Sequence, residues 1–408
     1  MLRLDELGEH LKQWLTSTEV LEAVLARLRD LDPIVKVGGS AVVTRHADVL
    51  EVLEDSRAFG VSETYGPRMQ RTTGAFVLGM EDTPQYQVEA SFIRKAVRPH
   101  DLPRIRALVL DEATQIIEGA RAAGRLDAAT GYARRLALRM VRDFFGVPGP
   151  DSATLGRWMR TIFWDLFLNL GNDEAVVAAA VASSDELRPY LRSLIAARQQ
   201  SISSGAPVPD DFVTRLVQSQ TQAGIDDDGV RRSLGGVIVG AVDTTSKATV
   251  LALDQLLRRP EALAGARAAA RAGDDQLVSA YAFEALRFNP HNSIIVRTCH
   301  RDTVLAAGTE RETTIERGTT VYAATLSAMF DETVVERPQE FRAGRPASSY
   351  LHFGRGQHTC FGERINQITI PEALKQLLLI PNLRRAAGDD GELVFEGPFP
   401  ERYLVELD

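Results

Sequence analysis

The sequence predicts a mainly helical α+β protein, because long segments carry apolar residues at helical spacing and only a few short runs are typical of strands. Apolar residues recur every three or four positions, with charged residues between them, in the segments 105–123, 132–145 and 175–199. The strand-like runs are bounded by Pro, Gly or charged residues, and the clearest are 293–298 and 319–323. We therefore expect a small sheet beside a helical body.

A β-hairpin and a long helix are also expected. Alternating apolar residues flank Gly38 and Gly39 within 34–43 (IVKVGGSAVV), and a Gly-Gly pair is typical of a hairpin turn. The apolar pattern over 226–259, with acids at its start and arginines at its end, predicts the longest helix of the chain. The polar stretch 201–211 is short and a helical pattern follows it, so it is interpreted as a surface loop. A single domain over residues 1–408 is expected.

Composition and charge limit the function classes. With 44% hydrophobic and 25% charged residues, the chain has the composition of an ordinary globular protein. A net charge of -8 with scattered basic residues argues against a nucleic-acid binder. The first twenty residues mix charges with apolar positions, so we expect a cytoplasmic protein with no membrane anchor. Two cysteines, Cys299 and Cys360, are too few for a disulfide scaffold, and one of them can do chemistry.

The most informative segment is 351–364, LHFGRGQHTCFGER, in which three glycines surround Cys360 just before a helical run. Glycines permit positive φ angles in a tight loop and let the backbone approach a flat ligand closely. A cysteine at a helix start is biased toward the thiolate by the helix dipole and by amide donors. The alternative is a buried, inert cysteine beside glycine turns.

This loop resembles the haem-ligand signature of the cytochrome P450 family, Phe-x-x-Gly-x-x-x-Cys-x-Gly with a His two residues before the Cys. The residues in register are Phe353, Gly354, Gly356, His358, Cys360 and Gly362. The resemblance implies the P450 fold, a helical prism with a small β-rich region, and haem b (iron protoporphyrin IX) as cofactor. It further implies that Cys360 is the axial thiolate, that Phe353 shields the sulfur, that Gly354 belongs to the haem-binding loop and that His358 meets a propionate.

Glu284 and Arg287 are three residues apart on a predicted helix, where they can pair, although such a pair alone is usually a solvated surface feature. The P450 family carries Glu-x-x-Arg at this place, and a second Arg from a later loop locks the first. Arg345 stands where that partner is expected. The resemblance therefore implies a fold-stabilising network of these three residues.

The run 240–245 (GAVDTT) breaks the long apolar helix with small and hydroxylated residues, which bond back to the i-4 carbonyl and bend a helix. A polar exposed stripe or a bent core helix is one interpretation. The run also resembles the P450 oxygen-binding groove, which implies that Gly240 lies at the haem, that Thr244 hydrogen-bonds dioxygen and that Asp243 relays protons. Arg297, which alone would be an edge-strand arginine, is implied to bind a haem propionate.

Two positions depart from the family pattern. Bacterial members usually carry Pro-Glu-His-x-x-x-Arg, with the His and the Arg on the propionates, where this chain has Tyr86 and Ala90. Tyr86 can donate a phenolic hydrogen bond to the haem, but the charge pair is missing. Pro371, in the helix after the cysteine, should kink that helix or mark its early end.

The resemblance places substrate-lining segments at 62–78, 161–170, 239–243 and 293–295. Core packing is the alternative for each of their apolar side chains, but together they indicate a lipophilic small-molecule substrate. These side chains are Phe76, Leu78, Phe163, Phe167, Leu168, Val239, Ile294 and Ile295.

The implied function is that of a monooxygenase, which splits dioxygen and inserts one oxygen atom into its substrate. No flavin or nicotinamide fingerprint is evident, so a ferredoxin and a ferredoxin reductase are the expected electron donors. A peroxide-driven or isomerase-type haem-thiolate enzyme is the alternative that Tyr86 and Ala90 suggest, and Asp243 with Thr244 counts against it. A haem-binding gas sensor or carrier is the non-enzyme alternative.

Overall fold

The structure is a computed structural model that describes residues 18–169 and 171–407, and these form two compact units. Unit 1 comprises the described residues up to Val61 together with Ala280–Cys360, and unit 2 comprises Ser62–Ser279 and the residues from Phe361. Most elements are helices and the sheets are small, which confirms the predicted fold class. The single domain over 1–408 stays a prediction. Most of the N-terminal twenty residues, and Leu170 of the segment 161–170, lie outside the described residues.

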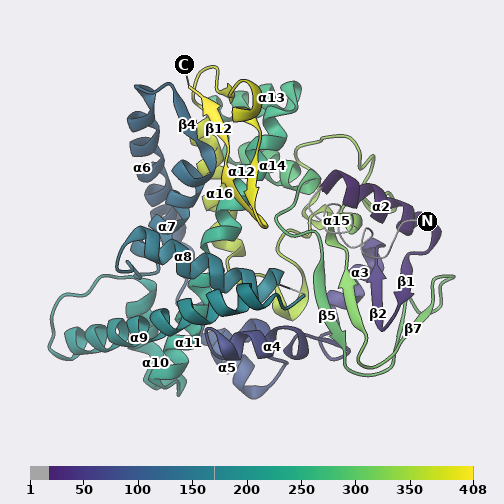
Figure 1. Ribbon diagram of the computed structural model, residues 1–408, viewed down its shortest axis with the longest axis horizontal. Coiled ribbons are helices and arrows are strands. Elements are labelled where there is room, and N and C mark those ends of the chain that lie inside the picture. The colour runs from purple at the N-terminus through teal and green to yellow at the C-terminus, as the bar shows by residue number, and fades with distance from the viewer. Residues whose placement is uncertain (1–17, 170, 408) are drawn as a thin grey trace. The chain divides into compact units, whose positions relative to one another are not determined.

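Unit 1 is built on a five-stranded sheet of order β1-β2-β8-β5-β3, with helices α2, α3 and α15 beside it (Figure 1). Its first two strands form the predicted hairpin: Ile34 pairs with Val43, and Gly38 and Gly39 turn the chain with positive φ angles. Strand β2 shows why the pattern forms a strand, because Ala41 and Val43 are fully buried while the residues between them are partly exposed. The bounds are α2 Thr18–Leu31, β1 Ile34–Val37, β2 Ser40–Val43, α3 His46–Glu54, β3 Phe59–Gly60, β5 Ile295–Cys299, β6 Thr303–Leu305, β7 Thr313–Ile315, β8 Thr320–Ala323 and α15 Thr325–Ala328, with α14 Asp275–Phe288 belonging to this unit from Ala280.

Unit 2 is a helical body around α12, which packs against α7, α8, α13, α16 and strand β11. Nearly every side chain of α12 is buried. A three-stranded sheet of order β4-β12-β9 and the hairpin β10-β11 complete the unit. The bounds are α4 Ser62–Arg71, α5 Pro84–Lys95, α6 Leu102–Arg121, β4 Arg125–Asp127, α7 Arg134–Asp143, α8 Ser152–Phe163, the π-helical turn η4 Trp164–Leu168, α9 Glu174–Ser203, α10 Phe212–Ala223, α11 Asp227–Val239, α12 Val242–Leu257, α13 Pro260–Ala272, α16 Glu363–Leu378, β9 Arg384–Arg385, β10 Val394–Glu396, β11 Phe399–Arg402 and β12 Leu404–Glu406.

The single long helix expected over 226–259 is divided into two helices, at the place where the hydroxyls of 240–245 were expected to bend it. The segment forms α11 and α12 with a break at Gly240 and Ala241, so the longest helix among the described residues is α9, with 30 residues. The Ala241 N–H bonds three residues back to Ile238, and the Thr244 hydroxyl donates to the Gly240 carbonyl at 2.5 Å. A hydroxyl that occupies a backbone acceptor disturbs the helical ladder at that point.

The same segment, Asp227–Leu257, is long and apolar enough to span a membrane by composition. However, 78% of its most apolar window is buried inside the protein. The segment therefore forms part of the core of unit 2.

The early end considered for the helix at Pro371 does not occur, because α16 continues through Pro371 to Leu378. A proline inside a helix costs about 3 kcal/mol. Ile370, Ala373 and Leu374 around it are buried, and α16 packs along both α6 and α12. Burial of this apolar face offsets the lost backbone hydrogen bond.

Candidate functional site

Glu284 is a fully buried carboxylate on α14 that is surrounded by hydrogen-bond donors. Arg287 donates through Nε and Nη2 at 3.0 and 2.9 Å, and Arg345 donates through Nε at 3.1 Å. The Tyr350 hydroxyl at 3.1 Å and the Arg342 N–H at 2.9 Å add two donors that sequence reasoning missed. Burial by itself would raise the pKa of Glu284, but the hydrogen bonds and the Arg287 charge outweigh it and lower that pKa. The carboxylate is therefore ionised and saturated with donors.

The loop that leads to the cysteine is fastened to α14 at a second point. His352 donates from Nε2 to the Phe283 carbonyl at 2.9 Å, and its ring stacks with the rings of Phe283 and Tyr350. Burial lowers the pKa of His352 to about 4, so the ring is neutral near pH 7. The loop is thus fixed in place several residues before Cys360.

Glycines shape the turn that carries the thiol. Gly354 and Gly356 have φ angles of 69° and 74°, a conformation that L side chains rarely adopt. A Cβ on Gly356 would lie 2.5 Å from the Leu53 carbonyl oxygen, because the loop backbone runs directly against the end of α3. The Cys360 N–H donates to the Phe353 carbonyl at 2.9 Å and closes the loop.

The two cysteines lie in opposite environments. Cys360 is exposed at the end of its loop, whereas Cys299 is buried in β5 and its Sγ donates to the Arg301 carbonyl at 2.9 Å. Burial raises the pKa of the Cys299 thiol. Because the thiolate is the form that binds a metal, Cys360 is the better ligand of the two.

The residues of unit 1 fit a haem group. An exposed thiol on a glycine-rich loop can reach an iron, and the nearly buried guanidinium of Arg297 supplies the fixed positive charge that a propionate requires. His358 stands half-buried in the same loop, and the ring of Phe353 lies 5.8 Å from that of Phe283. In unit 2, Tyr86 is buried on α5.

Asp243 and Thr244 lie in the first turn of α12, just after the helical break. Asp243 is 2% exposed, and burial raises its pKa to about 6 although the charge of Arg160 opposes this. Its Oδ1 lies 3.6 Å from Nε of Arg160, and its Oδ2 has no hydrogen-bond partner among the described residues. A carboxyl group with such a pKa exchanges protons near neutral pH.

One face of α11 and α12 remains partly exposed. Its members follow each other at spacings of three or four and are Arg232, Gly236, Gly240, Thr244 and Lys247. Thr244 therefore presents its side to open space rather than to the core. Lys247, which sequence reasoning missed, lies at the end of this face, and burial lowers its pKa to about 8.

Three of the predicted substrate contacts in unit 2, Phe76, Phe163 and Val239, lie in its core. The Phe76 ring is so close to Gly236 that a Cβ there would approach within 2.3 Å. Leu78 is half-buried. In this structure the three buried side chains contact protein rather than open space, as core packing would require.

The other predicted contacts have open surface. Phe167 is half-buried, and its ring lies 4.9 Å from that of Phe163 and 5.6 Å from that of Tyr65. Ile294 and Ile295 are half-buried at the start of β5 in unit 1.

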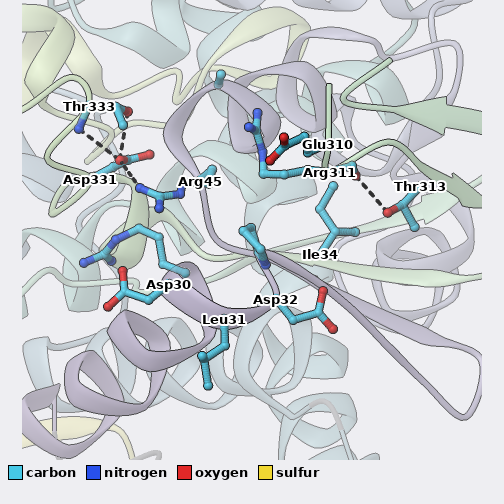
Figure 2. Close-up of a pocket in the computed structure, with 13 residues that line it drawn as sticks. Asp30, Leu31, Asp32, Ile34, Arg45, Glu310, Arg311, Thr313, Asp331 and Thr333 are labelled. Carbon is cyan, nitrogen blue, oxygen red and sulfur yellow. Dashed lines mark hydrogen bonds and ion pairs between the residues drawn. The ribbon is translucent and has the colours of Figure 1, made fainter. Parts of the chain in front are cut away.

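A separate cavity of about 530 Å³ opens in unit 1 between the end of α2, the start of β1 and the segment after α15. Figure 2 shows Arg45 and Thr333 both directed at Asp331, to which Arg45 is paired at 2.8 Å. Arginines and carboxylates line most of this cavity, and none of the predicted substrate contacts does. Its charged lining does not suit a lipophilic substrate.

Comparison with known proteins gives one consistent result. The family model described as Cytochrome P450 matches residues 157–380, more than half of the chain. Epothilone C/D epoxidase from Sorangium cellulosum is 27% identical, over 83% of this chain and 80% of that protein. Nocardicin C N-oxygenase from Nocardia uniformis subsp. tsuyamanensis is 26% identical, over 85% and 83%. The crystal structure of CalO2 has a similar fold, with a TM-score of 0.83 at 21% identity, covering 96% of this chain and 98% of that one.

We predict that Glu284→Gln is strongly destabilising, because it leaves the fully buried Arg287 without a counter-charge. The free energy of unfolding should fall by about 3 to 5 kcal/mol in chemical denaturation. Tyr350→Phe removes one neutral donor from the same carboxylate and should cost about 1 kcal/mol. Equal losses in the two variants would contradict the assignment of Glu284 as the centre of the network.

Gly356→Ala should damage the cysteine loop more than Gly344→Ala does. Both positions have positive φ angles, and an alanine there costs roughly 1 to 2 kcal/mol in strain. Only at Gly356 does the new Cβ also collide with backbone, whereas at Gly344 nothing lies within 4 Å. Gly356→Ala should therefore show the larger loss of unfolding free energy and the lower haem content after purification. Matching values for the two variants would show that the contact with α3 does not matter.

Proposed function

The chain belongs to the cytochrome P450 family and is a monooxygenase that binds haem b, and we propose that it oxidises a lipophilic small molecule with electrons from separate redox proteins. The observation that carries this proposal is the buried Asp243 carboxyl next to Thr244, at the break between α11 and α12. When bound, the haem supplies the activation of dioxygen and the transfer of one oxygen atom. The protein must hold the haem, exclude water and deliver protons.

We propose that the thiolate of Cys360 would bind the haem iron. The support is its exposed thiol, the glycine turn that presents it and the fastening of the loop to α14. Phe353 is proposed to cover the sulfur, and Arg297 and His358 to bind the propionates. Tyr86 takes the position of the usual histidine, where a phenol donates one hydrogen bond and carries no positive charge.

Asp243 and Thr244 are proposed to move protons. Asp243 takes up a proton at its carboxylate, and its Oδ2, which has no hydrogen-bond partner among the described residues, can receive it. The Thr244 hydroxyl, which donates to the Gly240 carbonyl at rest, can accept that proton on its oxygen while it donates its own to a water or ligand oxygen on the partly exposed face of the helix. A carboxyl with a pKa of about 6 holds and releases protons at physiological pH, whereas an ordinary aspartate is almost fully ionised there.

The substrate class rests on the half-buried apolar side chains of Leu78, Phe167, Ile294 and Ile295. Half-buried apolar side chains, two in each unit, favour lipophilic ligands. Two relatives are named as an epoxidase and an N-oxygenase, so related chains oxidise chemically different groups. We propose a ferredoxin and its reductase as donors in the cytoplasm, where reduced nicotinamide is available.

A peroxide-driven reaction is the second candidate, because the histidine and arginine usual on α5 are replaced by Tyr86 and Ala90. Such a reaction needs no delivered protons and no electron donor. Asp243 and Thr244 would then have no function, which is why the reaction with dioxygen is preferred.

The test compares Thr244→Ala with Thr249→Ala, because each hydroxyl donates to the carbonyl four residues earlier, that of Gly240 and that of Thr245. With dioxygen, a surrogate ferredoxin, its reductase and NADPH, Thr244→Ala should lower the product formed per NADPH by at least about tenfold and release hydrogen peroxide instead. Thr249→Ala should keep the wild-type ratio. The second candidate would be supported by two results together. The wild type and Thr244→Ala would turn over at equal rates, and peroxide alone would drive turnover as fast as dioxygen with the redox proteins.

A further inference from the structure

Arg160, at the end of α8, contacts three carboxylates at once. Its Nη1 donates to Glu396 and to Glu401, both at 2.8 Å, whereas its Nε lies 3.6 Å from Asp243. The last distance is too long for a hydrogen bond. Its Nη2 is buried and has no hydrogen-bond partner among the described residues. The hydrogen bonds of this arginine therefore go to the two glutamates, and Asp243 receives only part of its charge.

The two glutamates belong to the hairpin β10-β11, which is seated firmly on α8 and η4. The Phe399 ring lies 5.2 Å from the Arg160 guanidinium and 5.7 Å from the Trp164 ring. Gly397, with a φ of 55°, turns the hairpin so close to Trp164 that a Cβ would lie 2.5 Å from the indole. The positive φ angle and the lack of room for a Cβ both require glycine at this turn, and they define how the hairpin packs on its neighbours.

A second arginine also pairs with Glu401. Arg134 on α7 donates from Nη2 to Glu401 at 3.0 Å and to the Pro400 carbonyl at 2.9 Å. Arg134 and Arg160 thus both pair with Oε2 of Glu401, and these two ion pairs hold its carboxylate beside the guanidinium that faces Asp243.

We propose that Glu401, assisted by Glu396, is a positioning residue that holds Arg160 away from full pairing with Asp243 and so keeps Asp243 able to carry a proton. The importance of this for turnover rests on the proposed function of Asp243. The arrangement itself depends only on residues of unit 2.

The charges around Asp243 support this assignment. Burial raises the pKa of Asp243 most, Arg160 lowers it and Glu401 raises it. Because the Glu396 side chain is 63% exposed and that of Glu401 is 39% exposed, solvent screens Glu396 more, and Glu401 should have the larger effect.

The other elements packed against α12 add little charge at Asp243. From α16, the Asn366 amide faces Thr245, and from the turn before α7 the Tyr132 hydroxyl donates to the Ala373 carbonyl. On α12 itself, the pKa of Lys247 is lowered by burial alone. Arg160 and Glu401 are therefore the charged side chains that set the proton affinity of Asp243.

The experiment titrates the Asp243 carboxyl in the haem-loaded, resting protein by difference infrared spectroscopy, with Asp243→Asn as the blank. Glu401→Gln should lower the pKa of Asp243 below about 6, Glu396→Gln should lower it less, and the double variant should lower it most. Arg160→Gln should raise it. The control is Glu186→Gln, which removes the carboxylate paired with Arg157 on the same helix at 2.6 Å and should leave the titration unchanged.

The outcomes separate the two proposals. If Glu401→Gln and the double variant titrate like Glu186→Gln, or with a higher pKa, the positioning role is wrong. If the titration shifts as expected and product formation per NADPH falls at a lower pH in Glu401→Gln than in the wild type, both proposals stand. A shifted titration with an unchanged pH profile would retain the positioning role and remove Asp243 from proton delivery.

Discussion

The buried carboxylate of Glu284 is the constraint on which the cysteine loop depends. A carboxylate with no access to water needs several donors, and three of those that Glu284 receives, from Arg342, Arg345 and Tyr350, come from the segment that leads to Cys360. The ionised side chain thus ties this segment to α14. The glycine turn and the bond from the Cys360 N–H to Phe353 then need to define only the last few residues. Because the residues that pair with Glu284 come before the loop of Cys360, they hold this segment in place without covering the thiol, which is exposed.

In unit 2, a buried aspartate, Asp243, must stay able to take up a proton inside a helical core. The Thr244 hydroxyl donates a hydrogen bond to the Gly240 carbonyl at the break between the helices. The helix α12 starts at Val242, after this break, and Asp243 lies in its first turn. Burial raises the pKa of this aspartate, and full pairing with Arg160 would cancel that effect. Arg160 contacts three carboxylates, and Glu396 and Glu401 balance its charge. Asp243 therefore does not have to stay ionised to neutralise the arginine.

Much of the fold and the thiolate loop could be predicted because their signals are local. Gly38 and Gly39 between alternating apolar residues indicate the hairpin, and the glycines around Cys360 indicate its turn. A bend near Gly240 could be predicted, because hydroxyls in the run 240–245 bond back to the i-4 carbonyl, but the local pattern could not show that the segment divides there into two helices. Arg160 and Glu401 could not be predicted, since they are far from Asp243 in the sequence and an isolated Arg or Glu on an amphipathic element has no distinguishing pattern.

The glycine-rich loop 351–360 is expected to present Cys360 as the thiolate ligand of haem iron. The most direct measurement is the absorption spectrum of the reduced protein exposed to carbon monoxide, for the wild type, Cys360→Ala and Cys299→Ala. We expect a strongly red-shifted Soret band in the wild type and in Cys299→Ala, because that thiol is buried in β5, and its loss in Cys360→Ala. An unchanged band in Cys360→Ala, or its loss in Cys299→Ala alone, would show that Cys360 is not the ligand.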